Sequence, residues 1–283
     1  MKLIAHRGCA LQAPENSLAG IRYTASRAIE HIECDISVAS DDVAVVFHDA
    51  YLGRMTGDRR SVLACRSDEL CRMPLYFRDQ PTQETIPLAT DYLRLAKAHR
   101  LFVHLELKVH DQEIQRVVDA AIASIASSQI ALNALRISSF SLPALTYCHT
   151  QLPGAAYGIA CHHPVEVAHL DCAALGVVSV HANVEAVQTA DLAPLKQRGL
   201  EVYLYTVNHA ASLAHLSADA FDGVFTKGSG TKFGVGFTGL PFIDINFEYR
   251  MGDFTELKTN GSTSSTDVTN KAFMISLSLP FVL

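Results

Sequence analysis

The sequence predicts an α/β fold, a (β/α)₈ TIM barrel with an insertion after its second strand and a C-terminal extension that resembles a β-hairpin. The first observation behind this prediction is that short apolar runs alternate about eight times with segments of helical period. The second is size, because 283 residues with 49% hydrophobic side chains suffice for one barrel and an appendage. The third is that no glycine-rich strand-to-helix fingerprint is present, so a doubly wound dinucleotide-binding sheet ranks second.

The expected strands are the runs rich in β-branched and aromatic residues. They span residues 3–6, 32–38, 102–108, 136–140, 155–160, 177–181, 202–207 and 223–226. Between most of them, apolar residues recur with a helical period. The expected helices span residues 17–29, 89–100, 111–127, 164–175 and 189–198. Ser17 and Asp111 have side chains typical of helix N-caps, and Gly199 is placed to end a helix.

Residues 49–87 interrupt this alternation. They contain glycine, proline, aspartate and arginine but no complete strand–helix unit. Long loops of barrels usually carry function, so we expect an insertion after the second strand that packs over the catalytic face.

The composition changes a second time after the last barrel strand. Apolar and polar residues alternate in 243–250 and again within 272–283, on either side of a run rich in Ser, Thr and Asn. Residues 234–283 thus resemble the terminal hairpin of an outer-membrane β-barrel, although two strands alone leave unpaired edges. An ordinary hairpin or a loosely ordered tail fits the pattern equally. We therefore divide the chain into a barrel domain, residues 1–230, and a β-rich extension, residues 231–283.

Charge and cysteine usage exclude several classes of function. A formal net charge of −6 gives no basic stripe for nucleic acid. Seven cysteines, without a C-x-x-C pair, indicate free thiols in a reducing compartment. The sequence shows no signal peptide and no apolar run long enough for a transmembrane helix. Cytoplasmic residence is therefore expected, with membrane contact of the tail as the open alternative.

Glu33 and Asp35 lie on the second expected strand, so both side chains point to the same face while Cys34 points away. In a TIM barrel, the carboxyl ends of the strands converge on one mouth. The polar residues expected to reach this mouth from neighbouring strands are His6, Arg7, His48, Glu106 and Lys108. Hard oxygen ligands with histidines and cations around them indicate a divalent metal that holds an anionic substrate. The pattern favours cleavage of a phosphoester.

Short motifs in a fixed order carry a more specific indication. The stronger ones are His6-Arg7-Gly8, Pro14-Glu15-Asn16-Ser17, Glu33-x-Asp35, His48-Asp49 and Glu106-x-Lys108. Weaker ones follow at Ser139-Phe140, Tyr205-Thr206-Val207-Asn208 and Asp222-Gly223-Val224-Phe225-Thr226. Each motif alone is common, but together they resemble the glycerophosphodiester phosphodiesterase family across approximately residues 2–227.

The resemblance implies a role for each matched residue. One divalent cation, Mg²⁺ or Ca²⁺, would be ligated by Glu33, Asp35 and Glu106. Acid–base catalysis would fall to His6 and His48. The substrate would be bound by Arg7 and Lys108, which clamp the phosphate, and by Tyr205, an aromatic wall for the glycerol side. Glu15, Asn16 and Asp49 would position the metal ligands and catalytic side chains without contacting the reacting phosphate.

The activity that the resemblance implies is metal-dependent hydrolysis of a small glycerophosphodiester to glycerol 3-phosphate and an alcohol. Two residues depart from the family pattern, because Tyr205 stands where a tryptophan is usual and Lys227 where an aspartate is usual. Two alternatives stay open. The site would act on longer lipids as a lysophospholipase D if residues 49–87 lined an apolar groove. The chain would instead be a non-catalytic, membrane-associated protein, an alternative that the hairpin-like pattern of residues 234–283 motivates.

Overall fold

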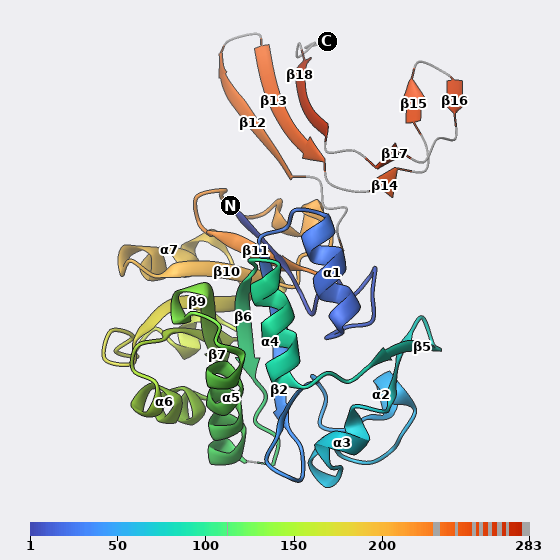
Figure 1. Cartoon of the computed structure of the whole chain (residues 1–283). Coiled ribbons are helices and arrows are strands. Elements are labelled where there is room, and N and C mark those ends of the chain that lie inside the picture. The colour runs from blue at the N-terminus through green and yellow to red at the C-terminus, as the bar shows by residue number, and fades with distance from the viewer. Residues whose placement is uncertain are drawn as a thin grey trace.

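The computed structural model describes residues 1–111 and 113–228 and, beyond them, the backbone of strands β12 to β18. Eight parallel strands close into a barrel, with helices packed around them (Figure 1). The barrel strands are β1 (Lys2–Ala5), β2 (His31–Val38), β6 (Phe102–Leu107), β7 (Leu135–Ser139), β8 (Ala156–Cys161), β9 (Val177–Asn183), β10 (Glu201–Tyr205) and β11 (Gly223–Thr226). Pairing between β1 and β2, with Ala5 opposite Ile32, closes the ring. The predicted TIM barrel is confirmed, and every barrel strand overlaps the run expected for it.

The main helices are α1 (Leu18–Ser26), α4 (Ala89–Ala98), α5 (Ile114–Ser128), α6 (Leu142–Gln151) and α7 (Thr189–Gln197). The Ser17 side chain accepts a hydrogen bond from the backbone N–H of Gly20, so the expected N-cap of α1 is confirmed. Gly199 follows α7 with a φ of +75°, the left-handed conformation that ends a helix. The remaining connections include short 3₁₀ turns, η2 (Leu132–Ala134), η4 (Val184–Ala186) and η5 (Ala210–Leu213).

The helix expected at residues 164–175 is wrong, because only a 3₁₀ turn, η3 (Pro164–Glu166), forms there. Local side chains take backbone N–H groups that a helix would use. The Asp171 carboxylate accepts from the backbone N–H of Ala174 at 3.2 Å, which favours a turn.

The N-cap expected at Asp111 is also wrong. Helix α5 begins three residues later, with Glu113 at the capping position. Asp111 has a φ of +48°, which belongs to a turn rather than to a helix entrance.

The insertion forms a small unit with its own core. Strand β3 (Ala44–Val46) runs antiparallel to β2 and leads into this unit. Its elements are α2 (Gly53–Thr56), η1 (Val62–Ala64), α3 (Ser67–Leu70), β4 (Pro74–Phe77) and β5 (Gln80–Thr85). Its buried side chains include Phe47, Leu52, Val62, Leu70, Leu75 and Ile86. The Glu84 carboxylate accepts from the backbone N–H of Ala19, which ties the insertion to the first turn of α1.

The side chains of β2 divide between two environments. Ile32, Cys34 and Ile36 are fully buried in the core between strands and helices. The alternate residues, Glu33 and Asp35, therefore face the barrel interior. All seven cysteines are free thiols, and Cys71 alone among them is not buried.

Beyond the barrel, β12 (Phe233–Leu240), β13 (Ile243–Arg250) and β18 (Ala272–Ser278) pair as an antiparallel sheet. Shorter pairs join β14 (Asp253–Phe254) to β17 (Val268–Thr269) and β15 (Leu257–Thr259) to β16 (Ser262–Ser264). Strands were expected at 243–250 and within 272–283, and both form. The likeness to an outer-membrane hairpin concerns side chains outside the described residues.

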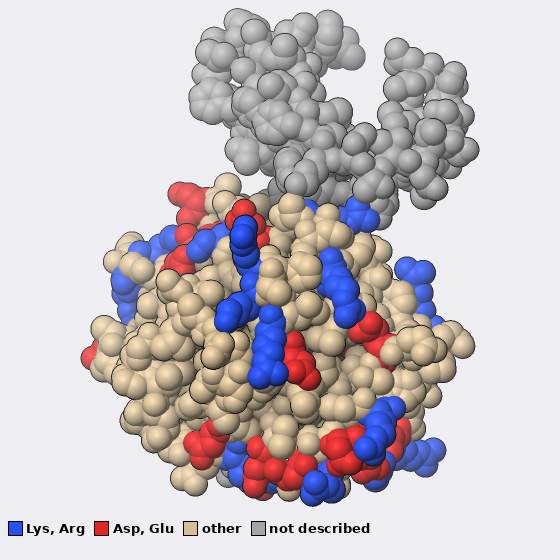
Figure 2. Space-filling view, in the orientation of Figure 1, with Lys and Arg blue, Asp and Glu red and all other residues tan. Residues whose placement is uncertain are grey.

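Basic and acidic side chains lie interspersed on the face of the barrel seen in Figure 2. Among the described residues, no helix combines the length and the apolar character needed to cross a bilayer.

Candidate active site

Three carboxylates meet at the mouth of the barrel, where β2 and β6 end. Asp35 lies opposite Glu106 in the parallel pairing of the two strands, and Glu33 shares a face with Asp35. One ligand oxygen from each lies within 4.8 Å of the others. Glu33 and Asp35 are only 2% and 1% exposed, and Glu33 Oε1 has no hydrogen-bond donor among the described residues.

The electrostatics of this cluster fit a divalent cation. Burial, followed by the neighbouring Asp35 and Glu106 carboxylates, raises the pKa of Glu33 well above its ordinary value. Burial opposes ionisation of Asp35 as well, but the Lys108 ammonium and the Arg7 guanidinium outweigh it and lower the pKa of Asp35. Crowded carboxylates with an unpaired buried oxygen are the donors that Mg²⁺ and Ca²⁺ prefer.

Asn16 holds Asp35 from behind. Its Nδ2 donates to Asp35 Oδ2 at 2.8 Å, and its Oδ1 accepts from the backbone N–H of Asp35 at 3.2 Å. Asn16 is 1% exposed and lies in the loop between β1 and α1. Both bonds restrict the carboxylate to one orientation, which is what a cation ligand requires.

His6 directly follows β1, and its backbone N–H donates to Thr226 in β11. Its Nδ1 lies 3.3 Å from the Thr206 hydroxyl and its Nε2 lies 3.7 Å from Glu33 Oε2. Burial, followed by Arg7, lowers the pKa of His6 well below its ordinary value, so the ring is neutral near pH 7.

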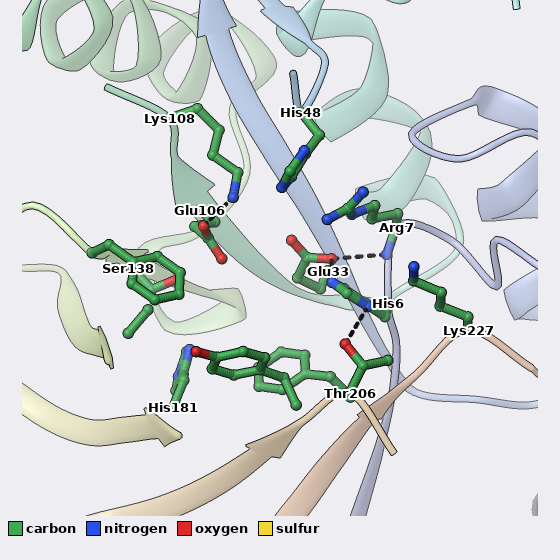
Figure 3. A pocket seen from close by; sticks show the side chains of 14 residues that line it. His6, Arg7, Glu33, His48, Glu106, Lys108, Ser138, His181, Thr206 and Lys227 are labelled. Atoms are coloured by element: carbon green, nitrogen blue, oxygen red, sulfur yellow. Dashed lines mark hydrogen bonds and ion pairs between the residues drawn. The ribbon is translucent and has the colours of Figure 1, made fainter. Parts of the chain in front are cut away.

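His48 approaches the carboxylates from the other side (Figure 3). Its Nδ1 lies 2.6 Å from Asp49 Oδ1, and the Arg54 Nε donates to the other Asp49 oxygen at 2.7 Å. Because Nδ1–H donates to a carboxylate, Nε2 is left for a partner in the pocket.

Two cations flank the carboxylate cluster. Arg7 Nε lies 3.3 Å from Asp35 Oδ2, and Lys108 Nζ lies 3.2 Å from Asp35 Oδ1. Glu15 also pairs with the Arg7 guanidinium and fixes its plane beside the pocket. Both cations are therefore held where a phosphate bound over the carboxylates would meet them.

The pocket over these groups has a volume of about 220 Å³. Seven residues that the sequence assigned to the site line it, namely His6, Arg7, Glu33, His48, Glu106, Lys108 and Tyr205. The other four do not line it but contact residues that do. Asp35 and Glu15 pair with the Arg7 guanidinium, the backbone N–H of Asn16 donates to the Arg7 carbonyl, and Asp49 bonds to His48. The aromatic wall consists of Tyr205, Phe140 and Phe225, and the Tyr205 hydroxyl donates to the Cys161 carbonyl at 2.9 Å.

Sequence reasoning missed several residues of this site. Thr206 contacts His6, and Arg54 bridges Glu15 and Asp49. His181 and Lys227 line the pocket. Thr206 directly follows Tyr205 in a quoted motif and could have been assigned, whereas Arg54 carries no sequence signal that places it here.

Such a mouth, with a candidate cation site between two histidines, can bind an anionic ester and supply the acid and the base for its hydrolysis. The model of the Glycerophosphoryl diester phosphodiesterase family matches residues 6–231, and the chain belongs to this family.

Relatives similar in sequence occur in bacteria and mammals. The chain is 24% identical over 230 residues to the glycerophosphodiester phosphodiesterase of Bacillus altitudinis. The matched region covers 80% of this chain and 94% of that protein. It is 28% identical over 172 residues to mouse glycerophosphodiester phosphodiesterase 1, a match to 59% of this chain and 50% of the mouse protein.

Solved structures share the fold. A phosphodiesterase of Oleispira antarctica, in complex with the product sn-glycerol-3-phosphate, superposes with a TM-score of 0.73 at 24% identity and covers 80% of this chain and 93% of that one. A glycerophosphodiester phosphodiesterase of Agrobacterium tumefaciens gives a TM-score of 0.67 at 21% identity, covering 81% and 96%.

Proposed function

We propose that this protein hydrolyses glycerophosphodiesters to glycerol 3-phosphate and an alcohol. The observation that carries the proposal is the set of three converging carboxylates, placed between His6 and His48 in a pocket flanked by Arg7 and Lys108. The Oleispira antarctica relative, whose structure holds sn-glycerol-3-phosphate, supports the choice of product. The substrate is thus a small molecule.

A divalent cation completes the site in this proposal. Glu33, Asp35 and Glu106 would hold Mg²⁺ or Ca²⁺ through their oxygens. When bound, the ion supplies positive charge to the phosphoryl oxygen beside it. Arg7 and Lys108 orient the same phosphate, Arg7 through its planar fork and Lys108 as a compact charge.

The two histidines would divide acid and base catalysis between them. One takes the proton of the attacking hydroxyl, and the other gives a proton to the departing alkoxide. The Asp49 carboxylate beside His48 Nδ1 leaves His48 Nε2 for this exchange, and the Thr206 hydroxyl beside His6 Nδ1 leaves His6 Nε2 for it. The attacking hydroxyl belongs either to water or to the glycerol of the substrate, and the bond from phosphorus to the alcohol oxygen breaks. Attack by the glycerol hydroxyl gives a cyclic phosphate, which water then opens to glycerol 3-phosphate.

Alanine substitution of each histidine tests this assignment. His6→Ala and His48→Ala should each lower kcat about 10²–10⁴-fold, measured as release of glycerol 3-phosphate from glycerophosphoethanolamine. His99→Ala, at an exposed position after α4, is the matched control and should keep the wild-type rate. Near-normal turnover of both active-site variants would refute the assignment.

Longer lipids are a poorer match to the pocket. A lysophospholipase D would need an apolar groove lined by the insertion, and no described residue of 49–87 lines the pocket. Glycerophosphocholine should therefore be hydrolysed faster than lysophosphatidylcholine. The opposite order in a direct comparison would favour the lipid substrate.

A further inference from the structure

Lys227 differs from every other cation around the pocket in its partners. Each of the other three cations is shared between two carboxylates. The pairs are Glu15 and Asp35 for Arg7, Glu15 and Asp49 for Arg54, and Asp35 and Glu106 for Lys108. Within residues 1–111 and 113–228, no carboxylate pairs with Lys227.

The backbone of Lys227 is nevertheless held firmly. It is the first residue after β11, at the mouth of the barrel. Its N–H donates to Asn208 Oδ1 at 3.1 Å, and its carbonyl accepts from the backbone N–H of Leu11 at 2.8 Å. The side chain lines the pocket beside His6 and Arg7 (Figure 3). The loops after β1 and β10 thus hold the backbone of Lys227 so that its ammonium group lies in the pocket.

The surroundings of Lys227 disfavour its charge. Burial, followed by the Arg7 guanidinium, lowers the pKa of Lys227. A half-buried cation without a carboxylate partner gains more from an arriving anion than a cation that is already paired.

A glycerophosphodiester has few groups that could be that anion. Its scissile phosphate is served by Arg7 and Lys108, which both contact the carboxylate cluster, whereas Lys227 contacts none of these carboxylates. Its glycerol is neutral. The remaining part of the substrate that can carry a negative charge to Lys227 is the alcohol that leaves.

We infer that Lys227 is a specificity-determining residue that selects glycerophosphodiesters whose alcohol carries a negative charge, a carboxylate or a phosphate. This inference rests on the proposed function, because it concerns the substrate of the same site. It ranks substrates with a cationic alcohol, such as choline or ethanolamine, below anionic ones.

Two substrates of matched length that differ in one terminal group test the inference. N-butyryl-glycerophosphoethanolamine has a neutral alcohol, and in its N-succinyl counterpart a carboxylate replaces the terminal methyl group. For the wild-type protein, kcat/KM should be about tenfold higher with the succinyl substrate at low salt, and added salt should reduce this ratio. A wild-type ratio near one that is insensitive to salt would overturn the inference without any variant.

Variants at position 227 locate the effect. Lys227→Met should bring the ratio of the two kcat/KM values close to one, and Lys227→Glu should invert it. Lys227→Arg should retain the preference, and Lys97→Met, at an exposed position on α4, should leave the ratio unchanged.

The outcomes are distinguishable. If Lys227→Met lowers kcat/KM equally for both substrates, then Lys227 contacts the scissile phosphate and the inference is wrong. If the wild-type protein releases glycerol 3-phosphate neither from these substrates nor from glycerophosphoethanolamine, the proposed function itself fails. If it does so from glycerophosphoethanolamine alone, the inference is wrong. If the Met variant does not fold, the Arg variant and the salt dependence of the wild-type ratio still decide the question.

Discussion

His181 makes the stability of the barrel depend on pH in a way that can be calculated. Its ring lies inside the barrel between Tyr203 and Phe225, and its Nε2 is 3.1 Å from the Ser179 hydroxyl. Burial, followed by the Arg136 guanidinium, lowers its pKa from 6.5 to about 3. The folded protein therefore keeps this ring neutral at pH values where the unfolded chain protonates it.

The sign and size of the effect follow from proton binding. Below its ordinary pKa, His181 takes up a proton in the unfolded state only, so the free energy of unfolding falls as the pH falls. Each pH unit costs about 1.4 kcal/mol, and the loss between pH 7 and pH 4.5 is about 2.5 kcal/mol for this one group.

Urea denaturation of the wild-type protein and of His181→Gln between pH 7 and pH 4.5 measures the contribution of His181 to the free energy of unfolding. Groups common to both proteins that do not interact with His181, such as the buried His6 with its lowered pKa, cancel in the difference. The variant should gain about 2.5 kcal/mol relative to wild type over this range. A difference that does not change with pH would show that His181 is not held neutral by burial, and the reasoning would fail.

Three further predictions concern the support of the site. Asp49→Asn should lower kcat about 10²-fold or more with unchanged circular dichroism, because the carboxylate that orients the His48 ring through Nδ1 is lost; equal rates would contradict this. Asn16→Ala should weaken Mg²⁺ or Ca²⁺ binding about 10–100-fold by calorimetry, because it releases the Asp35 carboxylate; unchanged affinity would exclude that role. Deletion of residues 234–283 should preserve kcat/KM, since no described site residue lies there, and a folded but inactive product would disprove it.

The barrel could be predicted because its signal is repeated and local. Apolar strands buried on their outer faces stand out even in a single sequence, and Glu33 and Asp35 were placed correctly by the two-residue period of β2. The turn at residues 164–175 could not be predicted, because the Asp171 carboxylate competes for backbone donors that periodicity ignores.

Contacts between distant segments were the part of the site that sequence could not supply. Arg54 reaches Glu15 across 39 residues of chain, and only the packed insertion brings the two together. Lys227 was visible as a departure from the family pattern. That no carboxylate in the described part of the chain pairs with it depends on the arrangement of the β1 and β10 loops around it.

Release of glycerol 3-phosphate before and after removal of divalent cations tests the central claim most directly. The three carboxylates of β2 and β6 should make hydrolysis of glycerophosphoethanolamine depend on a bound ion, so a chelator should abolish release and added Mg²⁺ or Ca²⁺ should restore it. Glu106→Gln should bind the ion more weakly and need a higher concentration for the same rate. Full activity of the chelated, metal-free wild-type protein would contradict the account.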